Sequence, residues 1–117
     1  MAPRIQPVTP STTHPDKADV AIIGAGLVGL CAALTLAERG LRVVVLEKGK
    51  IACEQSSRNL GWVRKTLRSA SDIPLALAAE QLWKGLPERV GAEVGYVPRG
   101  IMFTARTASE LAAHERW

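Results

Sequence analysis

Residues Asp19–Gly49 read DVAIIGAGLVGLCAALTLAERGLRVVVLEKG, and this order of residue types predicts a strand, a tight turn, a helix and a second strand. A short apolar run, Val20–Ile23, leads into three glycines with the spacing G-x-G-x-x-G. A helix-forming segment extends to Arg39, and a second apolar run, Val43–Leu46, ends at the acidic residue Glu47. This βαβ order is the arrangement that binds a dinucleotide.

Each glycine of the turn has a separate expected role. Gly24 allows the sharp turn out of the strand, Gly26 lets a pyrophosphate approach the backbone, and Gly29 lets the helix pack closely on the strand. The first N–H groups of the helix have no partner within it, so they suit an anionic phosphate. Glu47 can accept hydrogen bonds from ribose hydroxyls. The expected cofactor-binding residues of this unit are Gly24, Ala25, Gly26, Leu27, Val28, Gly29, Glu47 and Lys48.

The same stretch has two other interpretations. The uncharged segment Val20–Ala37 reaches the length of a membrane-spanning helix, which is about 18 residues. Its three glycines lower helix propensity, and Asp19 and Glu38 border it where an anchor would carry cations. We therefore expect no transmembrane segment. The other interpretation is a plain βαβ unit whose glycines only make turns.

The sequence also resembles a known family. Asp19–Gly49 resembles the amino-terminal FAD-binding motif of FAD-dependent oxidoreductases. Three later segments resemble the D-amino acid oxidase-like branch, which includes amine and amino acid oxidases and dehydrogenases; they are IACEQSSRNLGWVR (51–64), PLALAAEQLWKGLPE (74–88) and RGIMFTARTASELAAHE (99–115). The resemblance implies FAD as the cofactor. It implies an enzyme that oxidises a C–N bond of an amine or amino acid by hydride transfer to the flavin.

The resemblance also implies cofactor contacts in the segment after Glu47. Ser56, Ser57 and Arg58 are the positions that would contact the pyrophosphate or the flavin ring, because hydroxyls and a guanidinium satisfy phosphate and carbonyl oxygens. The alternative for these three residues is an ordinary solvated polar loop.

The acid at the end of the second strand bears on the choice of cofactor. Glu47 disfavours a 2′-phosphate, so NADP is not expected. A glutamate can hydrogen-bond the ribose of NAD or of FAD, and the resemblance favours FAD. An NAD-dependent dehydrogenase and a non-enzymatic, truncated or degenerate nucleotide-binding fragment remain as alternatives.

The predicted fold class is α/β, a Rossmann-like FAD-binding βαβ unit with the start of an inserted α+β substrate domain. Residues 1–17 are rich in proline and are expected to form a disordered tail. Residues 18–70 are expected to form the βαβ unit and a flavin-contacting loop, and residues 71–117 the incomplete start of a substrate or cap region. Both strands are apolar throughout, as in parallel sheets covered on both faces. We therefore expect the remaining strands beyond Trp117, so that the chain alone is an incomplete amino-terminal fragment that does not retain FAD stoichiometrically.

The second half of the sequence carries weaker signals. A helix is expected to start near Ser71 and to bury Leu75, Ala78, Leu82 and Leu86. Residues 96–104 predict two strands with a Pro/Gly interruption. The pattern T-x-x-E at Thr107–Glu110 predicts a capped final helix.

Composition limits the remaining possibilities. The 117 residues make one domain at most, and the net charge of +4 comes without an aromatic and basic surface, so nucleic acid is not an expected partner. Cys31 and Cys53 make no disulfide framework; both are expected to be reduced, with Cys31 buried in its helix, as in a cytoplasmic protein. His14 and His114 lack partners for catalysis. No metal site or catalytic residue is assigned, and the expected partner is a small amine or amino acid substrate.

Overall fold

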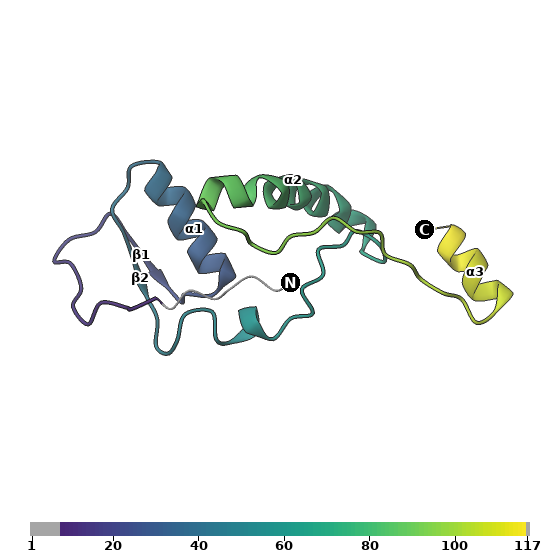
Figure 1. Cartoon of the computed structure of the whole chain (residues 1–117), viewed down its shortest axis with the longest axis horizontal. Coiled ribbons are helices and arrows are strands. Elements are labelled where there is room, and N and C mark those ends of the chain that lie inside the picture. Colours follow the sequence, from purple (N-terminus) through teal and green to yellow (C-terminus); the bar gives the residue numbers. More distant parts are fainter. Residues whose placement is uncertain (1–7, 117) are drawn as a thin grey trace. The chain divides into compact units, whose positions relative to one another are not determined.

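The computed structural model describes residues 8–116, and the chain divides into two units, one ending at Trp62 and the other beginning at Val63. The first unit contains strand β1 (Val20–Ile23), helix α1 (Leu27–Glu38), strand β2 (Val43–Leu46) and a short 3-10 helix, η1 (Gln55–Ser57) (Figure 1). The second contains the 3-10 helix η2 (Ala70–Asp72), helix α2 (Ile73–Val90) and helix α3 (Ala108–Glu115). The predicted tail lies partly outside the described residues, and residues 8–17 contain no helix or strand.

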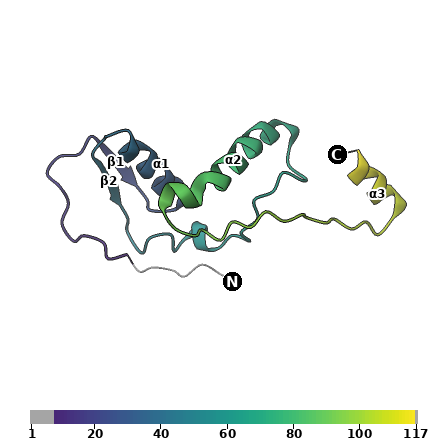
Figure 2. The ribbon, with the colours of Figure 1, turned by 45° about the horizontal axis from the view of Figure 1, so that its top comes forward.

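β1 and β2 form a two-stranded parallel sheet, and α1 connects them. Val20 lies opposite Val43 and Ile23 opposite Leu46, so the two apolar runs pair over their whole length. α1 contacts both strands, and Figure 2 shows it running alongside them. Branched apolar side chains suit a pleated surface, and the alanines and leucines of α1 are good helix formers. The predicted βαβ order and strand bounds are confirmed.

Little of this small sheet is covered by the rest of the described chain. Within residues 8–116, Ala25 is the one hydrophobic residue that is fully buried, at 2% exposed, whereas Ile23 is 90% exposed. Parallel apolar strands ordinarily have protein on both faces, and a single helix can cover only one.

The membrane-helix interpretation of Val20–Ala37 is wrong, because this segment forms a strand, a turn and most of a 12-residue helix. Across residues 8–116, no helix is both long enough and apolar enough to cross a membrane. The expected burial of Cys31 is also wrong. Its side chain is exposed, as is that of Cys53, because only part of α1 contacts the sheet.

An ion pair closes the start of the sheet. The guanidinium of Arg42 donates to both carboxylate oxygens of Asp19, with Nη2 at 2.6 Å from Oδ1 and Nε at 3.0 Å from Oδ2. The backbone N–H of Arg42 donates to the same Oδ2 at 2.8 Å. These hydrogen bonds lower the pKa of Asp19 from 3.8 to about 2. The pair fixes the strand register where the two strands begin.

Asp19→Asn is therefore expected to lower the free energy of unfolding at neutral pH and to lower it less at pH 2. A carboxyl group with a folded pKa below its unfolded value stabilises fully above the unfolded value of 3.8, and this stabilisation is lost as the pH falls through about 2. Urea unfolding of wild type and variant at pH 7 and pH 2 measures the difference. The effect is modest because Arg42 is exposed. A difference that does not change with pH would contradict this role.

α2 is held by contacts within the second unit. Pro74 occupies the first turn, where its missing N–H costs nothing, and the helix ends at Gly91 in the left-handed conformation, with a φ of 64°. Lys65 donates to Glu80 at 2.6 Å and lowers the pKa of that carboxyl group. Trp83 stacks on Tyr96 with ring centroids 5.8 Å apart.

Two expectations for the second unit are wrong. Leu75, Ala78 and Leu82 are exposed rather than buried, with Leu75 at 75% and Leu82 at 69%. Leu86 is half-buried and lies one helical turn from Trp83, which stacks on Tyr96. Residues 96–104 form no strands. The described residues offer them no strand partner, and Pro98 lacks a donor for a ladder.

The expected capped final helix is confirmed as α3. Thr107 Oγ1 accepts a hydrogen bond from the backbone N–H of Glu110 at 3.2 Å. The Glu110 carboxylate accepts one from the N–H of Arg106 at 2.7 Å. Thr107 therefore caps α3 as the T-x-x-E pattern predicts.

Candidate dinucleotide-binding site

The glycine turn between β1 and α1 is tightly built. Gly24 has a φ of 100°, in the left-handed region that side chains rarely adopt. A Cβ atom on Gly29 would lie only 2.1 Å from the carbonyl oxygen of Gly24, so α1 can approach the turn only because this position is a glycine. The turn has the geometry that the sharp bend and the close packing require.

Glu47 lies directly after β2 and reaches back to this turn. Its Oε2 accepts a hydrogen bond from the backbone N–H of Ala25 at 2.8 Å, and its Oε1 accepts one from the N–H of Gly49 at 2.8 Å. These N–H groups, with that of Ala25 contributing most, lower the pKa of Glu47, so its side chain is a carboxylate at neutral pH. Each carboxylate oxygen has a second lone pair that can accept a hydrogen bond from a hydroxyl group.

Ser56, on η1, approaches the turn from the following segment. Its Oγ accepts a hydrogen bond from the backbone N–H of Leu27, the first residue of α1, at 2.8 Å. A Cβ atom on Gly26 would lie 3.2 Å from the same Oγ. The hydroxyl therefore stands at the helix N-terminus, and its own proton remains available to an acceptor.

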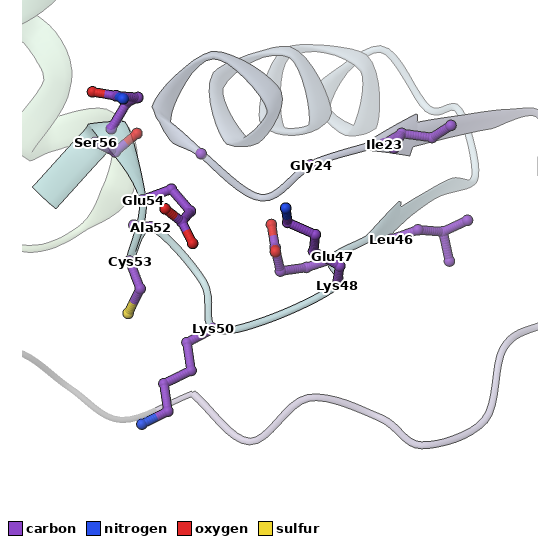
Figure 3. A pocket seen from close by; sticks show the side chains of 12 residues that line it. Ile23, Gly24, Leu46, Glu47, Lys48, Lys50, Ala52, Cys53, Glu54 and Ser56 are labelled. Carbon is purple, nitrogen blue, oxygen red and sulfur yellow. The ribbon is translucent and has the colours of Figure 1, made fainter.

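These groups border a cavity of about 360 Å³ between the turn and the segment after β2 (Figure 3). In Figure 3 the side chains of Glu47 and Lys48 point toward the glycine turn, and that of Lys50 points away. The predicted residues that line the cavity are Gly24, Gly26, Glu47, Lys48 and Ser56.

The other predicted residues are placed differently. Ala25 lies in the turn and is buried, and Gly29 packs against Gly24. Leu27 meets the site through its backbone N–H, and the Val28 side chain is 86% exposed. Ser57 donates to the carbonyl oxygen of Glu54 at 3.0 Å, and Arg58 pairs with the Glu54 carboxylate at 3.2 Å. The Ser57 and Arg58 side chains do not line the cavity.

Two parts of the site were not predicted. The backbone N–H of Ala52 donates to the carbonyl oxygen of Ala25 at 2.9 Å and ties the later segment to the turn. Glu54 lines the cavity and holds Arg58. The second pairing had a signal, because residues four apart with opposite charge meet on one side of a helical turn.

The residues present fit a dinucleotide. The turn offers open space at Gly24, a helix N-terminus and the Ser56 hydroxyl beside it, all of which suit a pyrophosphate. A carboxylate stands at the end of the neighbouring strand, where it suits ribose hydroxyls. The fold and the cavity together are those of a dinucleotide-binding α/β protein.

Comparison with known proteins gives the family. Residues 19–117 match the FAD dependent oxidoreductase family, and the chain belongs to it. It is 34% identical over 105 residues to a glycine oxidase of Geobacillus kaustophilus, an alignment that covers 84% of this chain and 27% of that protein. It is 28% identical over 100 residues to the sarcosine oxidase subunit beta of Rhodobacter capsulatus, covering 84% of this chain and 24% of that protein.

A solved structure is also similar. The L-amino acid deaminase of Proteus myxofaciens, solved in complex with anthranilate, superposes with a TM-score of 0.88 at 32% identity. The superposition covers 99% of this chain and 26% of that one. The chain thus spans about a quarter of the length of these relatives. The predicted α/β fold and the resemblance to FAD-dependent oxidoreductases are confirmed.

Proposed function

We propose that this chain supplies the part of a flavoenzyme that binds the ADP half of FAD. The observation that carries the proposal is the meeting of three elements at one cavity: the glycine turn, the Glu47 carboxylate and the Ser56 hydroxyl. Membership of an FAD-dependent family supports FAD over a nicotinamide cofactor.

Each group has a proposed role toward the cofactor. The turn from Gly24 to Gly29, with the first N–H groups of α1, holds the pyrophosphate, and Glu47 holds the ribose. Ser56 donates its hydroxyl proton to a phosphate oxygen, and Lys48 adds positive charge at the cavity. Ser57 and Arg58 face the flavin side once Arg58 leaves Glu54, which an exposed ion pair permits at small cost. Residues 18–70 form this cofactor part, and residues 71–117 begin the substrate region.

The proposed activity is oxidation of a C–N bond in a small amine or amino acid. The names of the relatives support it, since they are a glycine oxidase, a sarcosine oxidase subunit and an L-amino acid deaminase. Bound FAD would supply the two-electron acceptor for the hydride. The chain's own residues orient that cofactor and keep its phosphates neutralised. The two free cysteines agree with a cytoplasmic location.

The protein purified from its native source is expected to show the absorbance bands of oxidised flavin. Anaerobic addition of glycine, sarcosine or an L-amino acid is expected to bleach these bands, because the substrate transfers two electrons to the flavin. Absorbance spectra before and after addition measure this. A protein that binds a nicotinamide and no flavin would contradict the proposal, and flavin that none of these compounds bleaches would contradict the substrate class.

A further inference from the structure

The Glu47 carboxylate bridges two turns that follow neighbouring strands. Ala25 lies in the turn after β1 and Gly49 in the turn after β2, and each donates its backbone N–H to a different oxygen of Glu47 at 2.8 Å. Both bonds are made to backbone groups of the chain itself. Glu47 therefore has a task that does not depend on a ribose.

The bond to Ala25 matters because this residue is 2% exposed. A buried N–H without a partner is destabilising, and water cannot replace a lost acceptor there. Two backbone hydrogen bonds also hold the turn: Gly24 N–H donates to Leu46 at 2.7 Å, and the carbonyl oxygen of Ala25 accepts from Ala52 at 2.9 Å. Glu47 provides the side-chain acceptor that completes this set.

We propose that Glu47 is a positioning residue for the phosphate turn, and that through Ala25 it fixes the backbone that receives a pyrophosphate. The inference rests on the proposed function for its ligand, but its geometry consists of contacts within the chain. A positioning role differs from a role limited to ribose binding in one consequence. Pyrophosphate binding depends on Glu47 even when the ligand carries no ribose.

The first test uses amide hydrogen exchange in the cofactor-free protein. In Glu47→Ala the Ala25 N–H loses its acceptor, and its exchange is expected to become roughly tenfold faster or more. The Gly24 N–H, which donates to a backbone carbonyl, is the internal reference. Glu54→Ala is the matched control, because Glu54 lines the same cavity without a hydrogen bond from Ala25. Unchanged exchange at Ala25 in Glu47→Ala would overturn the proposal.

The second test compares two ligands, ADP and inorganic pyrophosphate, by calorimetric titration. If Glu47 positions the turn, Glu47→Ala weakens both ligands, by roughly tenfold or more for pyrophosphate. A role limited to the ribose would weaken ADP alone and overturn the proposal. Glu47→Gln keeps one acceptor oxygen, so it is expected to fall between wild type and alanine and serves if the alanine variant does not fold.

The two tests separate this inference from the proposed function. A wild-type protein that binds neither ligand would contradict nucleotide binding, and the exchange rate at Ala25 would still decide whether Glu47 positions the turn. Suppose instead that a Glu47→Ala protein with a normal thermal melt binds ADP and pyrophosphate as wild type does. That result would overturn the positioning role of Glu47, and the glycine turn would still stand as the proposed phosphate site.

Discussion

Gly29→Ala is expected to unfold the βαβ unit or to displace α1 from the sheet. The added Cβ would lie 2.1 Å from the carbonyl oxygen of Gly24 and 3.2 Å from its carbonyl carbon, and neither backbone atom can rotate away. Overpacking typically costs about 1–3 kcal/mol and occasionally more, which is a large part of the stability of a small unit. Circular dichroism during urea unfolding measures the loss.

Gly85→Ala provides the matched control for this change. Gly85 also lies inside a helix, α2, but a Cβ there would meet nothing within 4 Å. Because alanine favours a helix over glycine, this variant is expected to gain about 1 kcal/mol or less. If Gly29→Ala were as stable as Gly85→Ala, the close packing of α1 on the turn would not exist.

Gly26→Val is expected to weaken cofactor binding strongly and to leave the secondary structure largely intact. A Cβ at Gly26 already lies 3.2 Å from Ser56 Oγ, so the branched side chain of valine displaces the hydroxyl and covers the backbone that a pyrophosphate would approach. A penalty of about 1–3 kcal/mol corresponds to a roughly 5- to 150-fold loss of affinity. Flavin fluorescence on release measures the affinity, and the far-ultraviolet circular dichroism spectrum checks the fold.

Gly26→Ala is the graded control for the valine variant. The single methyl group of alanine requires the Ser56 hydroxyl to shift by only a few tenths of an ångström. The loss of cofactor affinity is therefore expected to be smaller than in the valine variant. Equal flavin content in wild type and Gly26→Val would mean that the cofactor does not approach this turn.

Local signals predicted the first unit well. The glycine spacing and the two apolar runs gave β1, α1 and β2, because a parallel βαβ unit needs a sharp turn, a close helix and apolar strands in that order. In the second unit, the T-x-x-E pattern likewise predicted α3, since the cap of this helix depends on residues three apart. These features depend on neighbours in the sequence.

Longer-range features were not predictable in this way. Trp83 stacks on Tyr96, a contact across 13 positions that helical periodicity does not encode. In the site, the glycines and Glu47 followed from spacing, and Ser56 from family resemblance. The hydrogen bond from Ala25 to Glu47 joins residues 22 positions apart and depends on how β1 and β2 pair, whereas the ion pair between Glu54 and Arg58 is local.

Hydrogen exchange with and without FAD, followed by mass spectrometry on the protein in its natural length, tests the central claim most directly. The account predicts that FAD slows exchange in residues 24–29 and in the segment 47–58, because the cofactor covers the glycine turn and the cavity beside it. No protection at residues 24–29 when FAD is bound would contradict the account.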